Sequence, residues 1–97
     1  MAQVIYAETA RLDLERLAEF LSESSLAAAL RTYDLVTGAI AILEKHPLIG
    51  RPSARDLREL VISRGKSGYA ALYDYREQDD CVIVLAIRHQ REAGYAE

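Results

Sequence analysis

The chain lacks the features that hold together small stapled or metal-bound domains. Cys81 is its single cysteine, so no internal disulfide can form and a reducing compartment fits best. This cysteine opens an apolar run, which predicts a packed thiol rather than a nucleophile. The acidic residues between 77 and 80 come without a histidine, so we predict neither a metal site nor a cofactor.

Long apolar runs and targeting signals are also predicted to be absent. We expect no run near the roughly 20 residues that cross a bilayer. Glu8 comes early in an N-terminus without the basic and apolar blocks of a signal peptide. The expectation is a cytoplasmic protein with no membrane contact. A length of 97 residues, with 51% hydrophobic and 28% charged residues, predicts a single domain over 1–97.

Positive charge is scarce in the first half of the chain. Residues 1–44 hold three arginines and no lysine against seven acids, whereas residues 45–97 hold nine lysines and arginines against eight acids. The net charge of −3 does not indicate a nucleic-acid-binding protein. The cations in the second half form either a solvated mixed-charge surface or part of a binding face.

Two amphipathic helices are predicted before residue 47. Apolar residues recur at helical spacing from Leu14 to Leu21, after Thr9 as the predicted N-cap. Ser25 is placed as the cap of the second helix, and Pro47 ends it. The second helix carries one apolar stripe in steps of four, three, four and three: Ala29, Tyr33, Val36, Ile40 and Leu43. The short connector predicts an antiparallel helical hairpin.

Four short stretches have the composition of strands: residues 3–6, 57–63, 69–75 and 82–87. The unbroken apolar run at 82–87 predicts a central strand buried on both faces. The resulting order is β-α-α-β-β-β. It predicts an α+β fold of two layers, with the helical hairpin packed on a small, largely antiparallel sheet.

Several stretches resemble the RelE/ParE superfamily of toxins from type II toxin–antitoxin systems. They are HPLIGRP at 46–52, LRELV at 57–61 with GY at 68–69 and LYDY at 72–75, and VIVLAIRHQREAGY at 82–95. The last is the most specific, because an apolar strand running into Arg-His-x-Arg and then Tyr is rare in generic β structure. The resemblance spans essentially the whole chain and implies the same fold.

The resemblance implies a cognate antitoxin and one of two activities. RelE-like toxins cut mRNA on the ribosome, and ParE-like toxins poison DNA gyrase. RNA cleavage by 2′-OH attack needs an acid, a base and cations for the phosphorane charge. If the chain is a nuclease, His89, Arg91 and Tyr95 are the predicted catalytic residues; each is otherwise a solvated or packed end of the last strand. The predicted target-binding cations are Arg64, Lys66, Arg88 and Arg91.

One position departs from the RelE-like pattern. Those nucleases carry an arginine directly after the Gly-Tyr pair, where this chain has Ala70. Ala70 and the net acidity favour a ParE-like gyrase inhibitor. The ribosome-dependent mRNA endonuclease stays as the alternative, and a non-toxic relative that only binds the antitoxin is the third hypothesis.

The antitoxin is expected to lay an extended or helical segment across the helical hairpin and sheet. The predicted contacts are the second-helix residues Ala29, Tyr33, Val36 and Ile40, with exposed apolar residues beside that stripe as anchors. Toxin and antitoxin together are expected to form a complex, with a heterotetramer as the candidate assembly.

Overall fold

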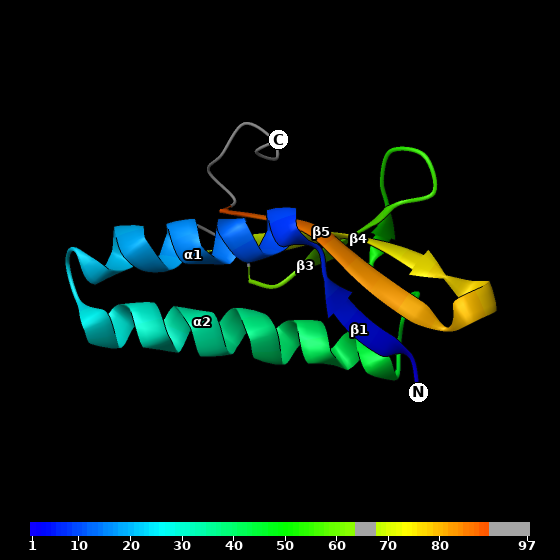
Figure 1. The fold of residues 1–97 in the computed structure, drawn as a ribbon, viewed down its shortest axis with the longest axis horizontal. Coiled ribbons are helices and arrows are strands. Elements are labelled where there is room, and N and C mark those ends of the chain that lie inside the picture. Colours follow the sequence, from blue (N-terminus) through cyan, green and yellow to red (C-terminus); the bar gives the residue numbers. More distant parts are fainter. Residues whose placement is uncertain (64–67, 90–97) are drawn as a thin grey trace.

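The computed structural model describes residues 1–63 and 68–89. Its elements follow in the order β1 (Gln3–Tyr6), α1 (Glu8–Ser22), α2 (Leu26–Ile40), the 3-10 turn η1 (Ala41–Glu44), β2 (Arg51–Pro52), β3 (Arg58–Val61), β4 (Tyr69–Arg76), the 3-10 turn η2 (Glu77–Asp79) and β5 (Cys81–His89). The two helices lie side by side across one sheet (Figure 1). The predicted α+β architecture is confirmed, with β2 as an additional two-residue edge strand.

The sheet has five strands in the order β1-β5-β4-β3-β2. The pair β1–β5 is parallel, and the other three pairs are antiparallel, so the sheet is largely antiparallel as predicted. The parallel pair arises because α1 and α2 return the chain to the far side of the sheet before β2, and β5 then fills the place beside β1.

A bulge in β5 decides which of its side chains enter the core. Leu72 pairs with Ala86 but Tyr73 pairs with Val84, so Leu85 is an extra residue without its own partner. The inward row therefore shifts register, and Val82, Val84 and Ile87 are fully buried. Ile83 and Leu85 stay half-buried, so the predicted burial on both faces holds only in part.

Past the end of β1, the first turns of α1 complete the hydrogen bonding of β5. The Ala7 N–H donates to the Val84 carbonyl at 2.9 Å, and the Thr9 hydroxyl donates to the Leu85 carbonyl at 2.5 Å. The Ile87 N–H donates to the buried carboxylate of Asp13 at 2.9 Å. The N-cap is thus Ala7 rather than Thr9, because the Thr9 side chain serves the sheet instead of the helix.

The helical hairpin forms largely as the sequence predicts. The Ser25 hydroxyl accepts a hydrogen bond from the Ala28 N–H and caps α2. The α-helix ends at Ile40, and η1 carries the chain on toward Pro47, so the predicted helix tightens in its last turn. The hairpin turn projects beyond the sheet at one end of a molecule of 43 × 26 × 23 Å (Figure 1).

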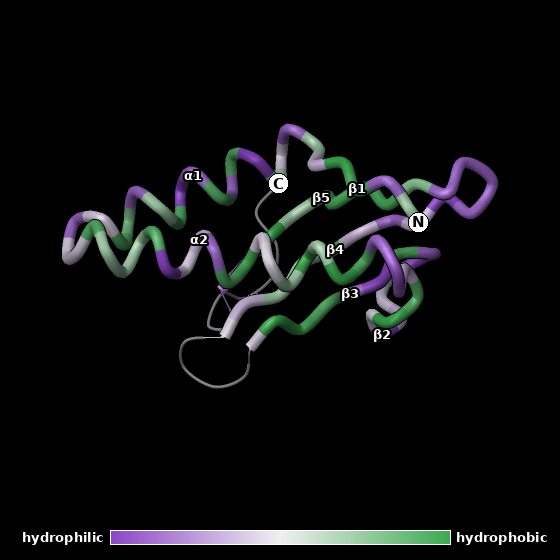
Figure 2. Tube along the Cα trace, turned by 90° about the horizontal axis from the view of Figure 1, so that it is seen from below, coloured by the Kyte–Doolittle hydropathy of each residue, from purple (hydrophilic) through white to green (hydrophobic). Residues whose placement is uncertain are grey.

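The core lies between the hairpin and the strands β4 and β5. Its fully buried larger side chains come from both layers: Val36, Ile40, Leu43, Tyr73, Val82, Val84 and Ile87. Hydrophobic residues continue along both helices past the last strand, where no sheet lies beneath them (Figure 2). Packing on the sheet therefore accounts for one end of the hairpin and leaves the other end open.

The expectation that no apolar run comes near the length of a membrane span is wrong. The segment Leu26–Glu44, formed by α2 and η1, has 19 residues and is long and apolar enough by composition to cross a membrane. A core helix of a soluble protein passes the same test. Here only 22% of the segment is buried within the structure, which leaves much of its apolar surface without an intramolecular partner.

Candidate protein-binding surface

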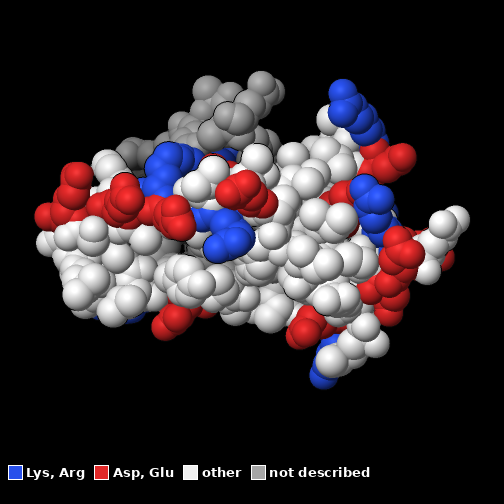
Figure 3. Space-filling model, viewed as in Figure 1, with Lys and Arg blue, Asp and Glu red and all other residues white. Residues whose placement is uncertain are grey.

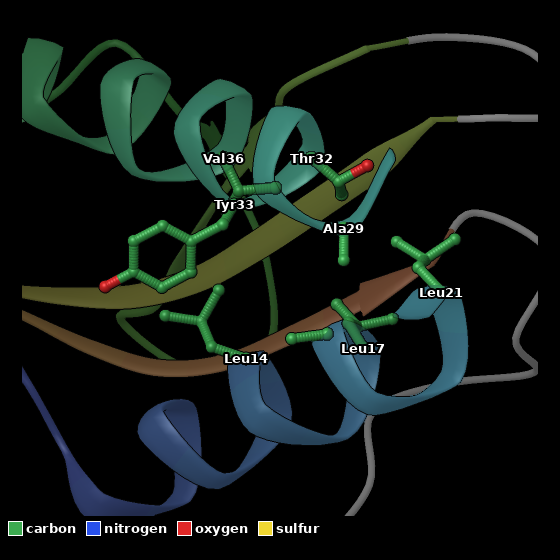
Figure 4. Close-up of a pocket in the computed structure, with 8 residues that line it drawn as sticks. Leu14, Leu17, Leu21, Ala29, Thr32, Tyr33 and Val36 are labelled. Atoms are coloured by element: carbon green, nitrogen blue, oxygen red, sulfur yellow. The ribbon is translucent and has the colours of Figure 1, made fainter. Parts of the chain in front are cut away.

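An apolar groove runs between α1 and α2. At its centre the leucines of α1 point toward α2 (Figure 4). The residues that line this central part are Leu14, Leu17, Ala18, Leu21, Ala29, Thr32, Tyr33 and Val36. Tyr33 also borders two further hollows, one toward the hairpin turn and one toward β1. The three hollows have this ring in common, and the surface that contains them is called the hairpin groove below. Its central part is closed by the contact between the helices, where Leu14, Leu17 and Val36 are buried, so the two outer hollows are the parts open to a partner.

The end of the groove near the hairpin turn exposes large apolar side chains. Leu26 is 67% exposed, Leu30 58% and Tyr33 49%. They follow each other by four and three residues and form an outer row beside the buried stripe of α2. An exposed contiguous apolar surface of this kind indicates a protein partner.

The structure separates the four residues predicted to bind the antitoxin. Tyr33 lies on the groove surface, but Ala29, Val36 and Ile40 are at most 5% exposed. Val36 and Ile40 belong to the core between hairpin and sheet, so their side chains are not available to a partner in this structure. The exposed anchors beside the stripe are Leu26 and Leu30. Their signal in the sequence is a second apolar row, in which each leucine precedes a residue of the stripe by three positions.

Acidic side chains border the groove along α1. Glu15, Glu19 and Glu23 follow each other at intervals of four residues and are all exposed. Glu19 also lines the hollow near the hairpin turn. Figure 3 shows red side chains, with blue ones among them, along α1 above a largely uncharged surface over α2. The groove therefore favours a partner segment with apolar side chains toward α2 and cations toward α1.

The opposite end of the groove contains a phenol with a perturbed pKa. Tyr6 of β1 lines the hollow there together with Arg11, Leu14, Tyr33 and Thr37. Burial, with a smaller effect from the neighbouring Tyr33, raises the pKa of Tyr6 to about 12. The Tyr6 hydroxyl, protonated at neutral pH like any tyrosine, can donate a hydrogen bond to a bound chain.

The end of β5 contains two of the predicted target or catalytic residues, Arg88 and His89. Arg88 pairs across the sheet with Ala70, and His89 pairs with Tyr69. Because neighbouring strand residues alternate, Arg88 and His89 lie on opposite faces of the sheet. His89 meets Tyr69 edge to face, with ring centroids 5.2 Å apart. The remaining predicted residues, Arg64, Lys66, Arg91 and Tyr95, lie outside the described residues.

Arg88 is part of an ion-pair network that sequence reasoning missed. Its guanidinium Nη2 lies 3.5 Å from Oε2 of Glu59, and its side chain is 15% exposed. The other carboxylate oxygen of Glu59 accepts from the guanidinium of Arg51, with Nε at 2.8 Å. Glu59 itself is 7% exposed. Residues 51, 59 and 88 carry no local spacing signal, because strand pairing alone brings them together.

Comparison with known proteins agrees with this architecture. The family model described as "ParE toxin of type II toxin-antitoxin system, parDE" matches residues 4–94. Toxin RelE3 of Caulobacter vibrioides is 35% identical over 92 residues, which cover 95% of this chain and 98% of that protein. 

Solved structures of toxin–antitoxin systems share the fold. The chromosomal ParDE system of P. aeruginosa contains a chain that matches with a TM-score of 0.76 and 18% identity, covering 92% of this chain and 96% of that one. The RelBE2 complex of Mycobacterium tuberculosis matches with a TM-score of 0.61 and 26% identity, covering 94% and 93%. The chain belongs to the ParE toxin family, within the RelE/ParE superfamily of type II toxin–antitoxin toxins.

Proposed function

We propose that this toxin is ParE-like in action: it inhibits DNA gyrase through protein contacts and does not cleave RNA. The observation that carries the proposal is the divergence of Arg88 and His89 at the end of β5. Cleavage by 2′-OH attack requires the proton-transfer group and the cation to meet at one phosphate. Arg88 lies on the opposite face of the strand from His89, so it cannot supply that cation without a change in the strand.

Two neighbouring features support this proposal. Ala70, at the position where RelE-like nucleases carry an arginine, is fully buried beside Arg88. Arg88 in turn is engaged with the carboxylate of Glu59. An arginine already held by an internal carboxylate offers less charge to a phosphate than a solvated one.

A RelE-like endonuclease remains the second candidate. It is favoured by the name of the Caulobacter relative, Toxin RelE3. Arg91 and Tyr95, which lie outside the described residues, would have to combine with His89 in that mechanism.

We further propose that a cognate antitoxin silences the toxin by occupying the hairpin groove in the cytoplasm. The solved relatives are described as toxin–antitoxin complexes or systems. The groove supplies exposed leucines for the apolar face of a helical or extended segment, and the glutamates of α1 supply pairing sites for its cations. A toxin dimer bridged by antitoxin would give the heterotetramer.

The two activities are separated by assaying purified toxin against both targets. Gyrase supercoiling of relaxed plasmid is expected to fall with toxin concentration, while ribosome-bound mRNA stays intact. His89→Ala is expected to retain most of the gyrase inhibition, because no proton moves. Ribosome-dependent mRNA cutting that His89→Ala reduces by about 10²–10⁴ would instead establish the nuclease.

A further inference from the structure

A second exposed apolar surface lies on the loop that follows η1. The buried hydroxyl of Tyr73 donates to the Pro47 carbonyl at 2.7 Å. The same oxygen accepts from the Gly50 N–H at 2.9 Å. One core side chain therefore fixes both ends of the turn from residue 47 to residue 50.

Arg58 of β3 fixes the same turn from a second direction. Its guanidinium Nη1 donates to the Gly50 carbonyl at 2.8 Å and to the Leu48 carbonyl at 3.3 Å. The turn approaches Tyr73 so closely that a Cβ on Gly50 would lie 2.6 Å from the tyrosine oxygen. A larger residue at this position therefore requires the loop or Tyr73 to shift.

The fixed turn displays two large apolar side chains. Leu48 is 59% exposed and Ile49 is 57% exposed. A single exposed leucine is common on protein surfaces. Two adjacent large apolar side chains on a backbone held by four side-chain hydrogen bonds are preorganised. This lowers the entropy lost when a partner binds them.

The segment that contains these two residues is rich in positive charge. Residues 45–58 contain four lysines and arginines and one acid, a net charge of +3 in a chain of net charge −3. Lys45 and Arg55 are exposed, and neither forms an ion pair with any residue in the described ranges 1–63 and 68–89. The segment is therefore apolar at Leu48 and Ile49 and cationic elsewhere along its length, whereas glutamates follow α1 beside the hairpin groove.

This surface is remote from the hairpin turn. It follows the C-terminal end of α2, whereas Leu26 begins that helix, and 15 helical residues span about 22 Å. Figure 1 shows η1 and the start of the following loop at the sheet end of the molecule, away from the hairpin turn. A segment lying near the hairpin turn leaves this loop uncovered.

We propose that the segment 45–58 is the surface by which the toxin holds its protein target. Leu48 and Ile49 enter an apolar depression on that target, and Lys45 and Arg55 face carboxylates around it. A protein is favoured over a nucleic acid because two adjacent apolar side chains gain nothing from phosphates. The proposal rests on the proposed function only in taking gyrase as that target.

The test combines two variants with a matched control. Leu48→Ala with Ile49→Ala removes the apolar pair without disturbing the buried anchors. Arg55→Gly removes one charge; Arg55 has a φ of 59°, so glycine fits its backbone without strain. Leu12→Ala, which truncates a 55% exposed leucine of α1 outside the groove lining, is the control.

The double variant is expected to raise the toxin concentration for half-inhibition of gyrase supercoiling by about tenfold or more, and to relieve growth arrest in cells without antitoxin. Arg55→Gly is expected to raise the half-inhibition concentration about threefold, and by less at high salt. Leu12→Ala is expected to change neither the half-inhibition concentration nor growth arrest. For all three variants, antitoxin affinity is expected to stay within about threefold of wild type, and the thermal midpoint within about 3 °C.

Unchanged growth arrest by the double variant overturns the inference, as does a parallel loss of antitoxin affinity. Arrest that depends on Arg55 but not on the apolar pair overturns it too, and indicates a nucleic acid. If the wild type arrests growth without inhibiting gyrase, the proposed target is wrong, and the surface is then judged on growth arrest alone. If the double variant fails to fold, Leu48→Ala and Ile49→Ala are made singly and are judged by the same outcomes.

Discussion

The hairpin groove and the loop at 47–50 both expose apolar side chains, but they are built in different ways. The groove is shaped by helical periodicity, and its exposed row on α2 projects where the sheet no longer supports the hairpin. The loop is shaped by hydrogen bonds from the core residue Tyr73 and from Arg58. One surface is long and adaptable, and the other is small and fixed.

The difference indicates two kinds of partner. A long apolar row with acidic borders suits a segment that folds as it binds, because such a segment gains area over many residues. A small preorganised pair suits a folded target whose surface is already formed. Substitutions that separate the two surfaces therefore test whether silencing and toxicity use different parts of the molecule.

The largest effect is expected from charges placed in the hairpin groove. Leu26→Asp with Leu30→Asp should weaken antitoxin binding by about 100-fold or more, because two apolar anchors are lost beside an acidic border. Both side chains are more than half exposed, so the fold should be retained. Titration calorimetry with the antitoxin measures the change.

Leu12→Asp is the control for added charge on an exposed helix position. Wild-type antitoxin affinity in the double variant would mean that the antitoxin binds elsewhere. Growth arrest by the double variant in cells that also express antitoxin is the corresponding cellular readout.

Gly50→Ala tests how rigidly the loop is held. The added Cβ would lie 2.6 Å from Tyr73 Oη and 3.0 Å from the Glu59 carbonyl, so the loop or the core must shift. We expect a loss of about 1–3 kcal/mol in unfolding free energy, which lowers the thermal midpoint by about 4–8 °C per kcal/mol.

Gly38→Ala is the matched control, because a Cβ on this α2 glycine meets nothing within 4 Å. It should raise stability by up to about 1 kcal/mol through helix propensity. Equal effects of the two substitutions would show that the loop is not packed against Tyr73.

Tyr73→Phe removes the hydroxyl and keeps the ring. The Pro47 carbonyl and Gly50 N–H both lose their partner, at a cost of about 1–2 kcal/mol. Amide hydrogen exchange at residues 48–50 should become faster, while amides of α1 and α2 keep their relative protection. Uniform acceleration over the whole chain would contradict a local role for this hydroxyl.

The smallest effect concerns stability at high pH. The pKa of Tyr6 is about 12 in the folded chain and 10.0 as the ordinary value, so its contribution is fully present below pH 10 and is lost as pH rises toward 12. Tyr6→Phe should flatten this decline by about 1 kcal/mol, measured by urea unfolding at pH 9 and pH 11.5. An unchanged slope would mean that Tyr6 is solvated in the folded state.

Much of the fold follows from local patterns in the sequence. The Ser25 cap, the stripe from Ala29 to Leu43 and the hairpin are set by helical periodicity and capping, which act over a few residues. The strand segments can likewise be predicted from local composition. The family can be predicted because its motifs are contiguous in the chain.

The sites depended on tertiary structure. Periodicity identifies an apolar stripe but does not tell which layer covers it. The stripe therefore predicts Val36 and Ile40 as antitoxin contacts, whereas in the structure both belong to the core between hairpin and sheet. The Leu85 bulge changes which side chains of β5 face inward, and no local signal marks it.

What the sequence by itself determined is the order of elements, the hairpin and the membership of the toxin family, since each depends on neighbours in the chain. Only the tertiary structure decided that His89 meets Tyr69, that Glu59 joins Arg51 to Arg88, and that Tyr73 holds the loop at Gly50. The physical reason is strand pairing: register places residues 8 to 29 positions apart in contact, and a single bulge changes every alignment beyond it.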